Sequence, residues 1–106
     1  MNMAIDEALL ESAAEDPTGP ATLRIYCWKE PTLSLGYFQA AADRRQHNAS
    51  LNCELVRRPS GGGAILHDDE LTYALVLPER IAISRDSQVW YAKAHRLLIA
   101  AIDELT

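Results

Sequence analysis

The sequence predicts a single α+β domain in which helices flank a mixed or antiparallel sheet. The apolar pattern indicates the order helix, two strands, helix, three strands, helix. This order lacks the regular strand–helix alternation of a dinucleotide-binding fold. At 106 residues the chain is one domain at most, and its 48% hydrophobic and 24% charged residues form an ordinary globular balance.

Residues 1–38 are expected to form one helix and two strands. Residues 2–14 have the apolar spacing of an amphipathic helix, and residues 16–20 form a loop with two prolines and a glycine. Residues 22–28 alternate between apolar and polar side chains, which is typical of a strand. We expect its apolar side, including Cys27, to face the core. Residues 32–38 are expected to be a second strand.

The middle of the chain is expected to form a short helix over residues 40–50 and a third strand over residues 54–58. That strand leads directly into a run of glycines. Segments 64–67 and 71–77 then have strand character and are separated by an acidic turn. We expect these two segments to form an antiparallel pair.

The last helix is expected to begin after Pro78, with Ser84 or Ser87 as its cap, and its apolar period continues to Thr106. The chain also opens directly in a helical pattern. A natural domain seldom begins and ends in mid-pattern. We therefore expect residues 1–106 to be the N-terminal part of a longer domain, truncated at both ends.

Charge and composition exclude several classes of protein. A net charge of −5 opposes a nucleic-acid partner bound through bulk positive charge. No apolar run approaches the roughly 20 residues that span a bilayer, and no basic segment begins the chain, so neither a membrane partner nor a secretory signal is expected. Cys27 and Cys53 have no metal-ligand spacing, so we predict no metal site. A cytoplasmic location is expected.

The most informative segment is 57–68, which reads RRPSGGGAILHD. Glycines let another molecule touch the backbone because no Cβ is in the way. Adjacent guanidinium groups supply planar donors for carboxylate or phosphate oxygens. The segment favours an anionic, adenylate-like or acyl ligand, and the alternative is a glycine-rich turn with exposed arginines. It is neither a Walker A loop nor a dinucleotide-binding motif.

This segment closely resembles the signature of the lipoate–protein ligase and octanoyltransferase family. The resemblance continues through residues 70–75 and reappears in 2–10 and 32–39, in the order and approximate spacing of the family. It implies a catalytic domain of the class II aminoacyl-tRNA synthetase and biotin ligase type. It also implies that residues 1–106 are the N-terminal part of that domain.

The resemblance implies two groups of binding residues. The substrate or adenylate site would contain Arg58, Ser60, Gly61, Gly62, Gly63, Ala64, Ile65, Leu66 and His67. The acyl pocket would contain Gly36, Tyr37 and Gln39. No catalytic residue is expected in this segment, because the lysine and cysteine that family members use lie beyond it. The segment alone would therefore be inactive.

The resemblance also implies the reaction and its partners. A lipoyl or octanoyl group would be joined to a lysine of the lipoyl domains of 2-oxoacid dehydrogenases or of the glycine-cleavage H protein. The ligase branch uses ATP and Mg²⁺ with lipoate or octanoate, whereas the octanoyltransferase branch needs no cofactor and takes the acyl group from acyl carrier protein.

The sequence leaves the branch open. Segment 66–73 is more similar to the transferases, whereas three glycines followed by Ala64 are more similar to the ligases. Two alternatives remain, a non-catalytic acyl- or adenylate-binding module (a degenerate paralogue) and a biotin–protein ligase.

Overall fold

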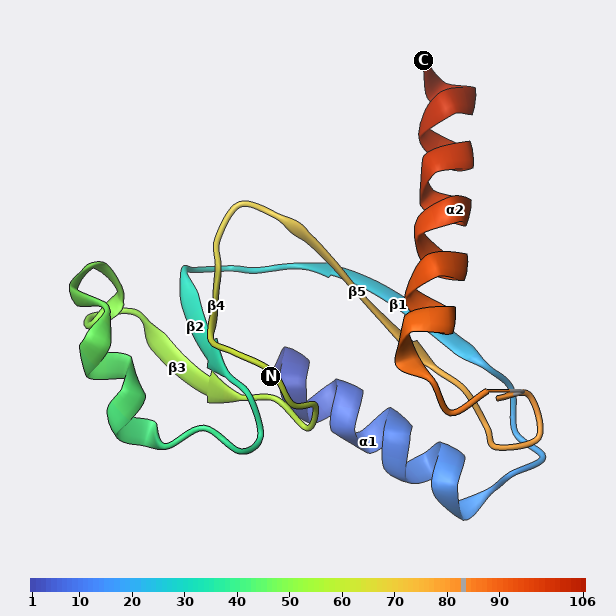
Figure 1. Cartoon of the computed structure of the whole chain (residues 1–106), viewed down its shortest axis with the longest axis horizontal. Coiled ribbons are helices and arrows are strands. Elements are labelled where there is room, and N and C mark those ends of the chain that lie inside the picture. The colour runs from blue at the N-terminus through green and yellow to red at the C-terminus, as the bar shows by residue number, and fades with distance from the viewer. Residues whose placement is uncertain (83) are drawn as a thin grey trace.

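The computed structural model describes residues 1–82 and 84–106. Within these residues, α-helices stand at both ends, and short strands and 3-10 helices lie between them (Figure 1). The elements in chain order are α1 (Asn2–Glu15), β1 (Thr22–Cys27), β2 (Thr32–Leu35), η1 (Ala41–Gln46), η2 (Asn48–Ser50), β3 (Glu54–Arg57), β4 (Ile65–His67), β5 (Leu71–Val76) and α2 (Ser87–Leu105). The predicted α+β class with a mixed sheet is confirmed, but the short helix expected over 40–50 is two 3-10 helices instead.

The strands form two small sheets. β1 pairs with β5 antiparallel, and β2 lies between β3, to which it is parallel, and β4, to which it is antiparallel. The expected antiparallel pairing of 64–67 with 71–77 is therefore wrong. The chain turns a corner between β1 and β2 and again between β4 and β5 (Figure 1). The antiparallel pair β1–β5 of the first sheet therefore continues as the antiparallel pair β2–β4 of the second. Ser34 then opposes Ile65, and Leu23 opposes Leu75.

The cap of α2 is Asp86, and neither of the two serines expected from the sequence. Asp86 accepts a hydrogen bond from the backbone N–H of Gln88 over 3.0 Å. Ser84 lies two residues before the cap and instead accepts a hydrogen bond from the backbone N–H of Asp86. An aspartate is as good an N-cap as a serine, so the sequence alone did not distinguish them. α2 extends away from the sheets and ends at the C-terminus (Figure 1).

The core is centred on β2, whose four residues are all buried. Leu33 and Leu35 are its buried apolar residues, and Val76 of β5 joins them in the core. Residues in the interior of a sheet are usually apolar, so the polar members Thr32 and Ser34 need hydrogen-bond partners. Ser34 finds those partners in the site described below.

The apolar side of β1 was expected to face the core, and this expectation is wrong in this chain. Leu23 and Ile25 are 61% and 53% exposed, and Cys27 is also exposed. The other side of β1 contacts α1 instead, where Arg24 pairs with Asp6 over 2.8 Å. The polar side of the strand is therefore the covered one. Among the described residues, neither helix has both the length and the apolar composition that crossing a bilayer requires.

Candidate functional site

The glycine loop, residues 61–63, is packed directly against the turn that follows β2. A Cβ on Gly36 would lie 2.0 Å from the carbonyl oxygen of Gly62, so only glycine allows this approach. Gly62 itself has a φ of 94°, in the region that favours glycine. The backbone N–H of Tyr37 donates to the carbonyl of Ser60 over 2.9 Å, which joins the two segments.

Arg58 occupies the centre of this loop. Its Nη2 donates to the carbonyls of Gly61 (3.0 Å) and Gly63 (2.7 Å), and its Nη1 donates to the carbonyl (3.0 Å) and the hydroxyl (2.7 Å) of Ser34. Burial lowers the pKa of Arg58 from its ordinary value, and nearby Tyr91 acts in the opposite direction. Both terminal nitrogens are thus bound by the protein itself. Arg58 shapes the loop, a role that the sequence did not predict.

The other arginine of the pair stabilises the neighbouring turn. Arg57 Nη1 donates to the carbonyls of Gly36, Tyr37 and Gln39. Three carbonyls converging on one guanidinium fix the conformation of this turn. Each of the two adjacent arginines therefore binds backbone carbonyls: Arg57 those of the turn after β2, and Arg58 those of the glycine loop that contacts it.

An open pocket of about 590 Å³ lies over the glycine loop. Its walls are Arg58 and residues 60–65 on one side, and Ser87 and Tyr91 on the other. The structure thus brings most of the predicted substrate site to one pocket. Sequence reasoning missed Ser87 and Tyr91, because α2 reaches the loop only through the tertiary fold and no local motif marks them.

A second pocket of about 750 Å³ adjoins the first and shares Arg58, Ser60, Ile65, Ser87 and Tyr91 with it. Its walls are mostly apolar and come from α1, β5 and α2. Its polar residues are Asp6, Tyr26, Arg58, Ser60, His67, Glu70, Thr72, Tyr73, Ser84, Arg85, Ser87 and Tyr91. The lining of the first pocket is more polar than that of the second, and this contrast suits a ligand with a headgroup and a hydrocarbon tail.

His67 belongs to the second pocket. It is 4% exposed, its ring stacks on Trp28 with centroids 4.2 Å apart, and its two nitrogens face Ser34 and Glu70. Leu66 lines neither of the two pockets and is 43% exposed. Alternation along β4 explains this difference between neighbours, because consecutive side chains of a strand point to opposite faces.

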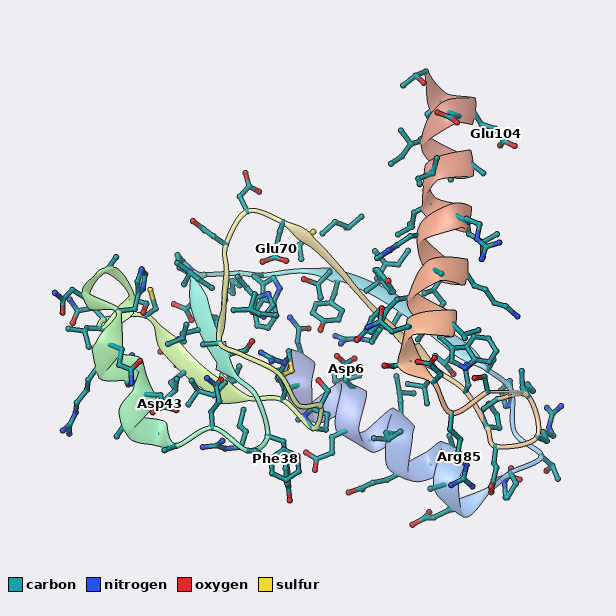
Figure 2. All side chains as sticks on the ribbon, viewed as in Figure 1. Asp6, Phe38, Asp43, Glu70, Arg85 and Glu104 are labelled. Carbon is teal, nitrogen blue, oxygen red and sulfur yellow. The ribbon has the colours of Figure 1, made fainter. Side chains whose placement is uncertain are left out.

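The three residues expected in the acyl pocket line neither pocket. Gly36, Tyr37 and Gln39 form the turn beside the glycine loop, where Gln39 Oε1 accepts from the N–H of Gly36 over 2.8 Å. Tyr37 is 56% exposed and packs edge-on against Phe38, which points away from the sheets (Figure 2). Their role in acyl binding stays a prediction. Among the described residues, no group of three or more His, Cys, Asp or Glu side chains is placed to hold a metal ion.

Comparison with known proteins decides the family. The model of the lipoyl protein ligase A/B catalytic domain matches residues 1–106. The chain belongs to this family.

Its relatives include octanoyltransferases. The chain is 50% identical over 82 residues to octanoyltransferase LipM of Oceanobacillus iheyensis, covering 76% of the chain and 30% of the relative. It is 46% identical over 110 residues to octanoyltransferase LipM of Moorella thermoacetica, covering 98% of the chain and 39% of the relative. The chain thus spans about a third of the length of these curated relatives.

A solved structure shows the same fold. Protein Ta0514 of T. acidophilum, assigned as a lipoate protein ligase, is 30% identical and superposes with a TM-score of 0.58. The match covers 70% of this chain and 30% of that one. The predicted resemblance, including its catalytic-domain fold, is confirmed by these findings.

Proposed function

We propose that the protein containing this chain transfers an octanoyl group to a lysine of lipoyl domains or of the glycine-cleavage H protein. Support comes from the octanoyltransferase relatives, which are about 50% identical over most of the chain. The observation that carries the proposal is the pocket over the glycine loop, whose lining is the more polar of the two, joined to a larger, mostly apolar pocket.

The two pockets suit the two ends of an acyl group. The hydrocarbon tail would occupy the apolar pocket between α1, β5 and α2, where each buried methylene contributes about 0.8 kcal/mol. The acyl carbonyl would lie over the glycine loop. The N–H groups of the three glycines donate to no other backbone group among the described residues, so they are available to its oxygen. In the overall reaction the C–S bond of the octanoyl thioester breaks, an amide C–N bond forms to the lysine Nζ, and the proton lost by the amine goes to the released thiol of the carrier protein.

Acyl carrier protein is the donor in this proposal, and no ATP or Mg²⁺ is used. An ATP-using ligase must neutralise several phosphate charges. Among the described residues, the glycine-loop pocket has one cationic side chain, Arg58, whose terminal nitrogens are already bound by the protein. The residues of this chain therefore fit an acyl headgroup better than a triphosphate. The proposed location is the cytoplasm, with these donor and acceptor proteins.

A lipoate–protein ligase is the second candidate, because Ta0514 has this assignment and is 30% identical. We place no catalytic residue in either reading within residues 1–106. Residues 60–65 would bind the acyl headgroup on the loop that Arg58 holds in place, and Ser87 and Tyr91 would complete that site.

The test uses the full-length protein that contains residues 1–106. It is incubated with a lipoyl domain and either octanoyl carrier protein or octanoate with ATP and Mg²⁺, and the mass of the domain is measured. An octanoyl adduct with carrier protein alone supports the proposal, and an adduct only with ATP supports the ligase. No adduct with either donor would leave a binding module and reject both enzymes.

A matched pair of variants tests the site. Arg58→Ala should abolish most of the transfer, because it removes the two hydrogen bonds to the carbonyls of Gly61 and Gly63 and the two that anchor the guanidinium to Ser34. Arg45→Ala removes the same charge from an exposed position and should leave transfer unchanged. Equal activities of the two variants would remove the glycine loop from the site.

A further inference from the structure

A chain of hydrogen bonds leads from Arg58 into the interior of the protein. Arg58 Nη1 donates to Ser34 Oγ over 2.7 Å, Ser34 Oγ lies 2.8 Å from His67 Nε2, and His67 Nδ1 lies 3.0 Å from Glu70 Oε1. Ser34 is fully buried and His67 nearly so. They stand on the paired strands β2 and β4, and Glu70 follows β4 and points between the strands (Figure 2).

The carboxylate of Glu70, at one end of this series of hydrogen bonds, sets which atom donates and which accepts in each of them. An ionised Glu70 can only accept, so His67 Nδ1 carries the proton. Nε2 of the neutral imidazole then accepts from the hydroxyl of Ser34, and the lone pair of that hydroxyl accepts from Arg58. In this order each donor has an acceptor and His67 is protonated at Nδ1; the carbonyl of Ile65, 3.5 Å from Ser34 Oγ, is a second and longer acceptor for the hydroxyl.

Glu70 is held in place from the other side. Thr72 Oγ1 donates to Glu70 Oε2 over 3.0 Å and accepts from Trp28 Nε1 over 2.8 Å. Trp28 also stacks on the ring of His67. The imidazole is therefore fixed in its plane by two hydrogen bonds and across its face by an aromatic ring. A network that is satisfied in this way, and buried at Ser34 and His67, favours one geometry of the imidazole.

Serine, histidine and glutamate at these distances have the arrangement of a catalytic triad. Ser34 Oγ is unsuited to be a nucleophile, because the residue has 0% exposure and its lone pair accepts from Arg58. A substrate carbonyl has no access to it. The same contacts instead connect the interior to the arginine that binds the carbonyls of the glycine loop.

We propose that Ser34, His67 and Glu70 are positioning residues that hold the guanidinium of Arg58, and through it the glycine loop, in the geometry that receives the acyl headgroup. The acyl part of this statement rests on the proposed function. The fixed tautomer of His67 and the restraint of Arg58 do not depend on the proposed function, so they are measured by a separate experiment.

The first experiment uses ¹⁵N NMR on the full-length protein, with the signals of His67 identified by their loss in His67→Gln. The wild type should show a protonated Nδ1 and an unprotonated Nε2 at neutral pH, and the Nη protons of Arg58 should exchange slowly with water. Glu70→Gln should mix the two tautomers, because an amide can donate as well as accept. A wild-type His67 protonated only at Nε2 would overturn the proposal.

The second experiment measures octanoyl transfer in Ser34→Ala, Glu70→Gln and Asp69→Asn. Each of the first two should reduce kcat about tenfold, equivalent to about 1.4 kcal/mol, and speed the exchange of the Arg58 Nη protons. Asp69→Asn makes the same charge change at the exposed neighbouring residue and should match the wild type in both readouts. Wild-type kcat in Ser34→Ala and Glu70→Gln would overturn the proposal.

The two experiments also separate failures. An inactive wild type with the expected His67 tautomer and slow Arg58 exchange would reject the proposed function while supporting the positioning role. An active wild type whose Arg58 protons exchange equally fast in all variants would reject the positioning role alone.

Discussion

Gly36→Ala is the substitution for which the structure makes the sharpest prediction. The added methyl carbon would lie 2.0 Å from the carbonyl oxygen of Gly62 and 2.9 Å from its carbonyl carbon. Ordinary contact requires roughly 1.5 Å more separation from the oxygen. Both neighbours are backbone, so the turn and the glycine loop must move apart.

The energetic cost follows from that displacement. Overpacking of this kind costs about 1–3 kcal/mol. Separation would also break the hydrogen bond from Tyr37 N–H to the carbonyl of Ser60, a loss of about 1 kcal/mol. We therefore expect Gly36→Ala to lower the free energy of unfolding by about 2–4 kcal/mol.

Two other glycines of the site provide graded controls. A Cβ on Gly63 would meet nothing within 4 Å, so Gly63→Ala should change stability by less than about 0.5 kcal/mol. Gly62 has a φ of 94°, and alanine there should cost about 1–2 kcal/mol. The assay is urea unfolding of the full-length protein, with midpoints compared at a common slope. If Gly36→Ala unfolds at the same midpoint as Gly63→Ala, the close approach of the two segments is refuted.

Three further predictions concern the elements around the site. Asp86→Ala removes the cap of α2 and should lower the free energy of unfolding in urea by about 1 kcal/mol. Glu79→Ala removes only an exposed ion pair with Arg85 and should lower it little, and equal effects of the two substitutions would contradict the cap assignment. Burial and, second, a hydrogen bond to Asp6 raise the pKa of Tyr26 above the ordinary value of 10.0. The neutral Tyr26 side chain therefore stabilises the fold below pH 10.0, and this stabilisation is lost as the pH rises further. Tyr26→Phe should flatten the alkaline fall of stability in a pH series of urea melts, whereas Tyr37→Phe should not; an unchanged slope in Tyr26→Phe would contradict this. Finally, a polypeptide of residues 1–106 alone should unfold without a cooperative calorimetric peak. Among the described residues, the only buried hydrophobic ones are Leu33, Leu35 and Val76, which is too small a core for a stable fold. A single sharp peak would count against this prediction.

The sequence predicted best the features that depend on residues close together along the chain. Strand alternation placed β1 and β5 correctly within a residue or two, and the glycine loop was expected at the site because its residues are contiguous. Sequence could not predict the partners of β4 and β5, because each pairs with a strand more than 30 residues away. Pairing at that distance is decided by how the whole chain folds.

The same limit applies to the site. Arg58 was expected to contact the ligand, but its partners depend on the directions of the Gly61 and Gly63 carbonyls, and no local pattern encodes these directions. Ser34 was not expected in the site at all. A polar residue in the middle of an apolar strand was the available signal, since a buried hydroxyl needs a partner.

The most direct test of the account is a crystal structure of the full-length protein with a bound octanoyl group. The account predicts the acyl carbonyl oxygen within hydrogen-bond distance of the N–H groups of residues 61–63, with the tail in the pocket between α1, β5 and α2. An octanoyl group bound elsewhere, with the three glycines facing only water, would contradict it.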